Sequence, residues 1–308
     1  MSRKIFSIPL NPKLSNDQYV EFVNFIGEYK DHIKDVYFTC RIAPFNQDAM
    51  GDIFVQQEDY QLAIDQALFV QQQTGVPVSA TFNNIQVPPS QKNLDTFIKN
   101  FKPVYDAGVR VATIPHTHWM ATGQIQKAFP ELYVKNTILR DVRLASEIVS
   151  LASYGFNYIN LDRDLMRDRD TLKRLLEAKV WIKENYGKEI HYSLLANEGC
   201  KGNCPMMVEH FEYNNTRAGR EPQYFNNAIS RVSCPKWDVD DPSIHLKTAN
   251  ITPWREDWEE YLDKLGIDVF KMHGREAISR LYETMNIVKR WANGDALLYD
   301  NFEQYLES

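Results

Sequence analysis

The 308-residue sequence has few cysteines, no long apolar run and no excess of basic residues. Its N-terminus, MSRKIFSIPLNPK, lacks the apolar core and the small-residue cleavage site of a secretory signal. No stretch approaches the roughly 20 apolar residues that a membrane span needs. The net charge of −6 does not favour a large nucleic acid as a partner. We therefore expect a cytoplasmic protein without a membrane span.

Four common catalytic or nucleotide-binding motifs are also missing. The sequence has no GxGxxG after a predicted strand and no GxxxxGK[ST]. Their absence disfavours a nucleotide-binding sheet. It likewise contains neither HExxH nor GxSxG. A zincin-type protease and a serine hydrolase of the nucleophile-elbow type are therefore not indicated.

Short apolar runs alternate with longer amphipathic segments along the chain. Strands are expected at residues 4–10, 35–42, 76–84, 109–115, 132–139, 158–162, 189–197 and 268–274. Helices are expected at 17–33, 59–73, 93–108, 141–155, 170–187, 205–213, 254–266 and 275–293, with a short helical piece at 123–129. Eight such units predict a TIM-like (β/α)8 barrel, with an open doubly wound sheet as the alternative.

The predicted barrel spans residues 1–308 as a single domain with one long irregular excursion. This excursion, at about 214–252, is too long for an ordinary strand-to-helix loop. In a barrel, such an insertion belongs with the loops over the C-terminal face, where the chemistry of this fold is built.

Three of the four cysteines lie near the C-terminal ends of predicted strands. Cys40 lies near the end of the second strand, and Cys200 and Cys204 follow the seventh. Cys234 lies in the long excursion before the eighth strand. A barrel would bring them to one face. Four thiolates at one point suit a tetrahedral zinc or an iron–sulfur cluster. The scattered spacing favours a [4Fe–4S] cluster over zinc, while four unconnected thiols remain the simpler alternative.

The residues around the cysteine pair resemble a known family. NEGC (197–200), CP (204–205) and His210, followed by CPKW (234–237) and TPWREDWEEYLDKLGIDVFKMHGR (252–275), resemble motifs of the collagenase-like peptidase family, the unknown-type peptidase family thirty-two. The similarity covers residues 194–275. The N-terminal half matches mainly in its barrel rhythm and in the position of Cys40.

This resemblance implies a TIM-like barrel that carries a [4Fe–4S] cluster on Cys40, Cys200, Cys204 and Cys234. Family members take part in oxygen-independent hydroxylation of nucleobases or of the ubiquinone ring, with prephenate implicated as hydroxyl donor. Two departures from the family pattern are evident. Cys234 lies after the pair rather than at the family position, and the extra domain of longer members is absent from this sequence.

Several polar residues near the same face are candidates for catalysis or substrate binding. Glu198 and His210 are candidates for acid–base chemistry, although a cap and an interface histidine are the simpler readings. Asn197, His116 and His118 are candidates for substrate binding, the two histidines being expected in a loop after the fourth strand.

Lys271, His273 and Arg275 alternate along the last strand and beyond it. Alternation places their side chains on one face of that strand. Inside a barrel, three such groups suit a carboxylate- or phosphate-bearing ligand, with Lys271 and His273 binding substrate and Arg275 acting in catalysis. Arg275 paired with an acidic residue of the last helix is the alternative.

Three functions from different classes follow. The first is an oxygen-independent hydroxylase-like oxidoreductase acting on a small-molecule or nucleobase or ring substrate. The second is a peptidase or hydrolase of the same family. The third is a non-catalytic subunit with a structural metal site, paired with a homologous partner subunit.

Overall fold

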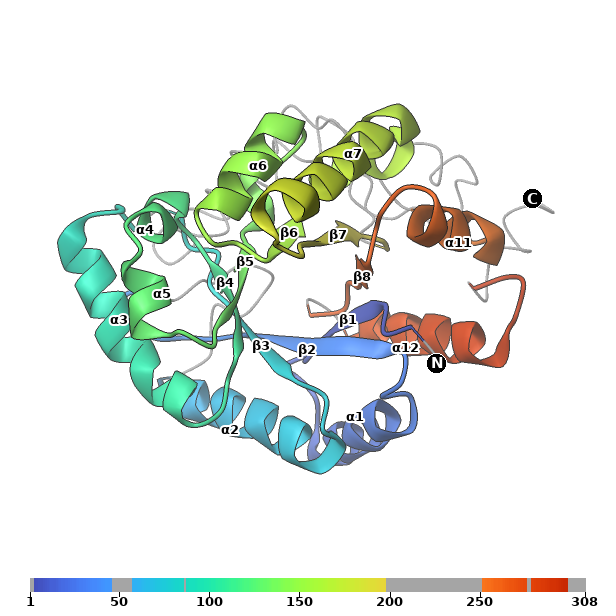
Figure 1. Cartoon of the computed structure of the whole chain (residues 1–308). Helices are drawn as coiled ribbons and strands as arrows, with labels where there is room; N and C mark the ends of the chain where they lie inside the picture. Colours follow the sequence, from blue (N-terminus) through green and yellow to red (C-terminus); the bar gives the residue numbers. More distant parts are fainter. Residues whose placement is uncertain (1–2, 46–56, 86, 198–250, 276–277, 299–308) are drawn as a thin grey trace, which may run out of the picture.

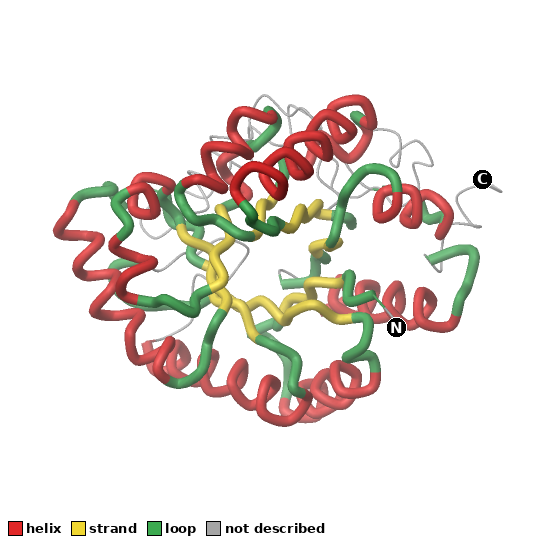
Figure 2. Tube along the Cα trace, in the orientation of Figure 1, coloured by secondary structure: helices red, strands yellow, loops and turns green. Residues whose placement is uncertain are grey.

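Eight short parallel strands, β1 to β8, pair in sequence order and close into a barrel in the computed structural model of the chain (Figure 2). They span Phe6–Pro9, Ile33–Thr39, Val78–Thr81, Val111–Ile114, Tyr133–Asn136, Tyr158–Asn160, His191–Leu195 and Val269–Lys271. The structure describes residues 3–45, 57–85, 87–197, 251–275 and 278–298. The predicted (β/α)8 barrel is confirmed, and the open sheet is excluded because β1 pairs with β8.

Helices connect the strands and surround the barrel (Figure 1). They are α1 (Asn16–Glu28), α2 (Gln57–Thr74), α3 (Gln91–Asp106), α4 (Thr117–Ala121), α5 (Gln124–Ala128), α6 (Ala145–Ser153), α7 (Arg169–Tyr186), α11 (Arg255–Asp263) and α12 (Ile278–Asn293). Short 3-10 helices at Ile138–Arg140 and Arg163–Arg167 precede α6 and α7. Among the described helices, none combines the length and the apolar character that crossing a bilayer requires.

The eight predicted strands all exist, but each is shorter than its apolar run. The run at 109–115, for example, forms only Val111–Ile114. Residues on either side of a strand are still buried where the hydrogen bonds between strands have ended. An apolar run in the sequence is therefore longer than the strand within it. The loop expected at residues 116–119 is instead the start of α4, because Trp119 is fully buried there. The predicted helix at 205–213 and the excursion at 214–252 lie outside the described residues.

Capping residues explain where the helices begin and end. Ser15 accepts a hydrogen bond from the Gln18 N–H, and the Gln18 side chain accepts one from the Ser15 N–H, which forms a capping box for α1. Asp168 accepts from the Thr171 N–H at the start of α7. That helix ends at Gly187, whose φ of +61° favours glycine.

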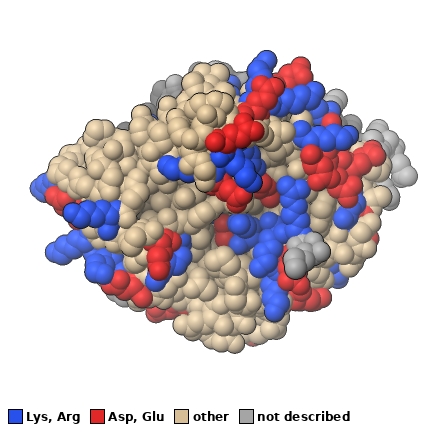
Figure 3. Space-filling view, in the orientation of Figure 1, with Lys and Arg blue, Asp and Glu red and all other residues tan. Residues whose placement is uncertain are grey.

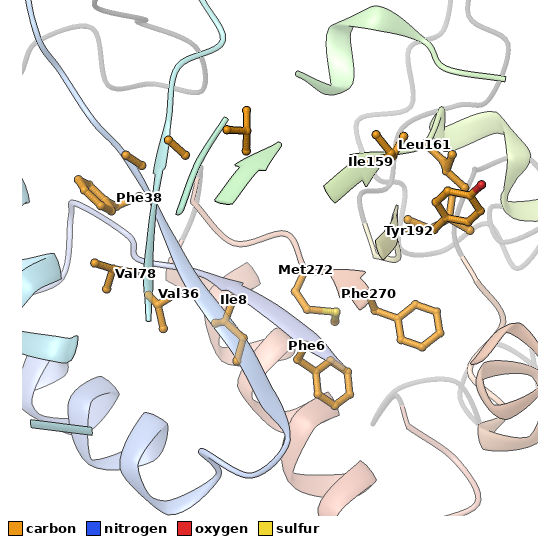
Figure 4. Close-up of a cluster of buried hydrophobic side chains, with 14 of the residues drawn as sticks. Phe6, Ile8, Val36, Phe38, Val78, Ile159, Leu161, Tyr192, Phe270 and Met272 are labelled. Atoms are coloured by element: carbon orange, nitrogen blue, oxygen red, sulfur yellow. The ribbon is translucent and has the colours of Figure 1, made fainter. Parts of the chain in front are cut away.

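The outward face of the barrel strands is apolar. Figure 4 shows ten side chains of this layer: Phe6, Ile8, Val36, Phe38, Val78, Ile159, Leu161, Tyr192, Phe270 and Met272. Phe6 lies between α11 and α12, with its ring 6.2 Å from that of Trp258 and 6.1 Å from that of Trp291. Burial of these side chains against the helices is the main favourable contribution to folding.

The outer surface carries mixed charge. On the face drawn in Figure 3, Lys and Arg atoms lie beside Asp and Glu atoms. The described surface also contains exposed ion pairs, such as Lys102–Asp106 at 2.8 Å within α3. Exposed pairs of this kind contribute less than about 1 kcal/mol each, so they do not determine the fold.

A polar network joins α7 to the first residues of β7 and β8. Lys179 Nζ lies 2.5 Å from Asp268 Oδ2, which also accepts from the Tyr192 N–H at 2.7 Å. His191 Nδ1 lies 3.8 Å from Asp268 Oδ1. Burial raises the pKa of Asp268, but the hydrogen bonds and charges of His191, Lys179 and Tyr192 outweigh it and hold the pKa below its ordinary value.

Replacement of Asp268 by Asn should therefore destabilise the protein in a pH-dependent way. Because the folded pKa lies below the unfolded value of about 4, the stabilisation is present above that pH and is lost as the pH falls through the folded pKa. We expect Asp268→Asn to lower the free energy of unfolding by about 1–3 kcal/mol at pH 7, and by much less near pH 2–3. Urea unfolding across this range measures the difference.

The control is Asp263→Asn, which removes an exposed carboxylate paired with Arg3. Its effect should stay within about 0.5 kcal/mol at every pH. If Asp268→Asn lowers the free energy of unfolding equally at pH 7 and pH 3, the pH dependence of stability does not come from this carboxylate.

Candidate functional site

The inward face of the barrel is rich in polar side chains, although Val111, Leu195 and Val269 also face the axis. Because side chains alternate along a strand, the residues between the outward apolar ones face the axis. These inward residues include Ser7, Asp35, Tyr37, Thr39, Ser79, Thr81, Thr113, Lys135, Tyr158, Asn160, Ser193 and Lys271. A TIM barrel interior is usually filled by bulky branched side chains. The polar side chains therefore distinguish this interior from that of most TIM barrels.

A buried ion pair crosses the barrel. Lys135 Nζ of β5 lies 2.6 Å from Asp35 Oδ2 of β2, and the two side chains are 4% and 3% exposed. Ser7 donates a hydrogen bond to the other Asp35 oxygen at 2.5 Å. The Lys135 ammonium also lies 4.3 Å from the centre of the Tyr158 ring. Burial lowers the pKa of Lys135, and the Asp35 carboxylate opposes that effect.

Buried polar residues follow the strands at the C-terminal end of the barrel. They include Asn11, Arg41, Asn83, His116, Thr137, Asp162, Arg163 and Asn197. Active sites of this fold lie at that end, because the loops after all the strands meet there. This ring of buried polar side chains is therefore the candidate functional site.

Lys271 and Arg275 reach the inside of this end, as alternation predicts. Lys271 Nζ lies 4.8 Å from the centre of the Tyr37 ring, and Arg275 Cζ lies 5.8 Å from it. Arg275 Nη1 donates to Thr39 Oγ1 at 2.9 Å. Tyr37 donates its hydroxyl proton to the Met272 carbonyl at 2.5 Å. Two cationic groups are thus placed over one aromatic ring in the upper part of the barrel.

The Asn197 side chain joins the ends of β7 and β8 to α12. Its Oδ1 accepts from the His273 N–H at 2.7 Å, and its Nδ2 donates to Thr284 Oγ1 at 3.1 Å. Thr284 in turn donates to the His273 carbonyl at 2.6 Å. Asn197 is fully buried, so these contacts make it a residue that positions His273 within the site.

Gly274 allows the chain to turn closely from β8 toward α12. Its φ is +138°, and a Cβ atom there would lie 2.7 Å from the Leu281 Cα. The Gly274 carbonyl accepts from Asn11 Nδ2 at 2.8 Å. Only glycine fits this approach, and it fixes the direction in which Arg275 leaves the strand.

The two predicted histidines point to different environments. His116 is 2% exposed and stacks edge-on against Trp119, whereas His118 is exposed. His116 Nε2 lies 2.6 Å from the Val87 carbonyl. Burial lowers the pKa of His116 to about 4, so the ring is neutral at pH 7 and Nε2 donates to that carbonyl. The two side chains therefore do not form one metal-binding or anion-binding pair.

Cys40 continues the β2 ladder and is 1% exposed. Its N–H donates to the Thr81 carbonyl at 3.3 Å, and its side chain belongs to the apolar cluster that also contains Phe38 and Phe45. Burial raises the pKa of the Cys40 thiol well above its ordinary value. A thiol in this setting is protonated and inert unless a cation binds it.

Five other predicted site residues lie outside the described residues: Glu198, Cys200, Cys204, His210 and Cys234. Within the described ranges, no group of three or more His, Cys, Asp and Glu side chains is placed to hold a metal ion. The four-cysteine site therefore stays a prediction, of which only Cys40 has a described position.

A cavity of about 730 Å³ lies at the rim, between the starts of α6 and α7. Arg143 in its wall is paired with Asp162 and with Asp164, the latter at 3.1 Å. Arg174 also lines the cavity, and the carboxylates of Asp164 and Asp168 in the same wall offset the two positive charges. This cavity is thus less suited to an anion than the region around Lys271 and Arg275.

The sequence interpretation missed the Lys135–Asp35 pair. A signal was available, because Asp35, Tyr37 and Thr39 alternate with apolar residues in the second predicted strand. The same alternation marks Lys135 in YVKN. Charged residues at every second position of a strand indicate a polar barrel interior once the barrel is assumed.

Comparison with known proteins places the fold. No family model matches the chain, and no curated protein matches it. Among solved structures, it is similar to the U32 peptidase Mk0906, with a TM-score of 0.55 and 10% identity over 89% of this chain and 93% of that chain. The shared feature is the barrel. This similarity supports the family resemblance at the level of the fold.

Two other solved structures have lower scores. The deoxyribose phosphate aldolase from Aeropyrum pernix has a TM-score of 0.43 and 11% identity, covering 91% of this chain and 89% of that chain. The 2,3-dimethylmalate lyase has a TM-score of 0.45 and 8% identity, covering 99% of this chain and 89% of that chain.

Neutralising one partner of the buried ion pair should be strongly destabilising. Asp35→Asn leaves the Lys135 ammonium buried without its counter-charge, so we expect a loss of about 3–5 kcal/mol in the free energy of unfolding. The double variant Asp35→Leu with Lys135→Met removes both charges and should recover most of this loss. Urea unfolding at pH 7 measures the free energy of unfolding of the unmodified protein, of Asp35→Asn and of the double variant.

The control is Asp65→Asn, which changes an exposed carboxylate on α2. It should stay within about 0.5 kcal/mol of the unmodified protein. If Asp35→Asn proves as stable as Asp65→Asn, the Lys135–Asp35 pair is not the buried charge pair described here.

Proposed function

We propose that this chain is an iron–sulfur barrel enzyme similar to the oxygen-independent hydroxylation proteins of the collagenase-like peptidase family. Cys40, Cys200, Cys204 and Cys234 would hold a [4Fe–4S] cluster. One observation carries the proposal. Cys40 lies at the C-terminal end of β2, and Asn197, three residues before Cys200, lies at the same end of the barrel after β7.

The described cysteine fits this role. Three residues separate Asn197 from Cys200 in the sequence, and an extended chain of that length spans at most about 11 Å. The Cys40 sulfur is removed from water and surrounded by apolar side chains. A thiolate in such a place is stabilised by direct bonding to a metal cation, as in an iron–sulfur cluster. Zinc on the same four residues is the alternative metal.

The residues around Tyr37 support a small anionic substrate. Lys271 and Arg275 lie at 4.8 Å and 5.8 Å from the Tyr37 ring. An ammonium and a guanidinium in a partly buried site bind a carboxylate or phosphate more strongly than they would in water. The Tyr37 ring is buried beside the two cationic groups and helps to hold them in place. A small compound with an acidic group suits this pair of cations.

The proposed roles divide binding from chemistry. Lys271 and His273 bind the substrate, and Arg275 holds its acidic group near the reacting atoms. Glu198 and His210 supply or accept protons. When bound by four thiolates, the cluster supplies electron transfer, because none of its irons has an open position for substrate. The buried, neutral His116 contributes a hydrogen-bond acceptor at Nδ1.

Peptide hydrolysis is the second candidate. It is favoured by the name of the solved structure to which the barrel is similar, a U32 peptidase. In this case Glu198 and His210 would act as the acid–base pair on a water molecule, and zinc would replace the cluster.

Metal and sulfide content distinguishes these functions. The protein, purified without oxygen, should contain about four iron and four acid-labile sulfide per chain and absorb near 400 nm. Both Cys40→Ala and Cys204→Ala should lose the iron and the absorption. The matched control is Val36→Ala, which truncates a buried residue on the same side of β2 and should keep the full iron content.

The other outcomes have clear meanings. A content of one zinc and no sulfide per chain would mean that the site is a hydrolytic or structural zinc site and not a cluster. A protein that folds only with its metal bound, and for which no catalysed reaction is found, would be a non-catalytic subunit. Full metal content in both cysteine variants would exclude Cys40 and Cys204 as ligands and overturn the proposal.

A further inference from the structure

The centre of the barrel is lined by three serines and one lysine. Ser7, Ser79, Lys135 and Ser193 come from β1, β3, β5 and β7. In a (β/α)8 barrel, alternate strands contribute the four side chains of one interior layer. The registers around the barrel place these four residues at one level.

This layer is unusual in the size of its side chains. The positions are normally filled by Val, Ile or Leu. A serine side chain is smaller than any of these, so three serines leave more room around the axis than a standard layer does. The Lys135 side chain is the one long member of this layer, and it crosses toward Asp35.

Several polar atoms at this level lack a hydrogen-bond partner. Within the described part of the chain, Ser79 Oγ is buried and has no hydrogen-bond partner, and the Ser193 and Tyr158 hydroxyls have none of good geometry. Burial raises the pKa of Tyr158, and an interaction of its hydroxyl with the Ser193 side chain opposes that effect. Buried hydroxyls without partners are costly, so native proteins generally satisfy them.

The Lys135 ammonium adds donors to the same region. It has three N–H groups, and the described residues give it one hydrogen bond, to Asp35 Oδ2 at 2.6 Å. Its nitrogen lies above the Tyr158 ring, 4.3 Å from the centre of that ring, and the Tyr158 hydroxyl interacts with Ser193 of the same layer. Donors and acceptors therefore converge on the space that the small side chains leave.

We propose that the centre of the barrel is a binding site for ordered water, held by Lys135, Ser79, Ser193 and Tyr158. Water both donates and accepts, as hydroxyls and an ammonium together require, and a buried water commonly has two to four polar partners. A cation would be repelled by Lys135. An anion would place an uncompensated charge beside the neutral Lys135–Asp35 pair.

This water has a consequence for the ion pair. A buried pair is stable only when its remaining lone pairs and protons are satisfied. Water at this level supplies acceptors to the two remaining Lys135 N–H groups. It thereby keeps Lys135 charged and directed toward Asp35 inside an otherwise closed barrel. This inference does not depend on the proposed cluster or substrate.

Serine-to-alanine variants test the site through the sign of their effect. If water is bound, Ser79→Ala and Ser193→Ala each remove one of its anchors, and the melting temperature should fall by about 2–4 °C. If the region is dry, the same changes delete an unpartnered hydroxyl and the melting temperature should rise. Alanine is smaller than serine, so steric overpacking cannot cause a fall.

The control is Ser150→Ala, an exposed serine of α6 whose hydroxyl bonds to the Ser146 carbonyl. It should change the melting temperature by less than about 1 °C. No change or a rise in both Ser79→Ala and Ser193→Ala, relative to this control, overturns the proposal.

A crystal structure at about 1.5 Å of the unmodified protein provides an independent measurement. Ordered water within 3.2 Å of at least two of the four named groups supports the site. Direct hydrogen bonds from Ser79 and from the remaining Lys135 N–H groups to other protein atoms, with no water between them, overturn it.

Discussion

Closure of the eight parallel strands is the constraint on which the rest of this structure depends. Because β1 pairs with β8, every strand must end at the same rim, however far apart the ends lie in sequence. Thr39 and Arg275 are 236 residues apart and share a hydrogen bond for this reason. The same closure separates each strand into a helix-facing side and an axis-facing side.

The two sides of the strands have different roles. The outward residues, such as Phe6 and Phe270, pack on the helices and stabilise the fold. The inward residues carry hydroxyl, amide, carboxylate and ammonium groups. An interior of this kind is costly to bury. The Lys135–Asp35 pair and the Asn136–Asn160 hydrogen bonds, at 2.6 Å and 3.0 Å, offset part of that cost.

The sequence was sufficient for the architecture and for one part of the site. The β/α rhythm predicts the barrel, and alternation along KMHGR predicts that Lys271 and Arg275 share a side. It does not reveal that Asp35 and Lys135, 100 residues apart, meet across the axis. Each looks like a charged interruption of an apolar run until closure places them opposite one another.

Local sequence also failed for HTHW. The spacing of the two histidines predicts a loop pair in which both could face one ligand. Burial of Trp119 instead turns the segment into α4, with His116 as the residue that precedes its first turn. Tertiary packing of one large aromatic side chain thus decides where two polar neighbours lie.

Thr39 and Cys40 are adjacent in the chain but face opposite sides of the barrel wall. Thr39 accepts from Arg275 inside the barrel, whereas Cys40 lies in the apolar cluster outside it. In the proposed enzyme, Cys40 would be one of the residues that hold the cluster, whereas Lys271 and Arg275 would bind an anion on the other side of β2. The β2 backbone thus separates the residue proposed as a metal ligand from the residues proposed to bind substrate. A cluster bound entirely by cysteine would supply electron transfer rather than bind the substrate itself.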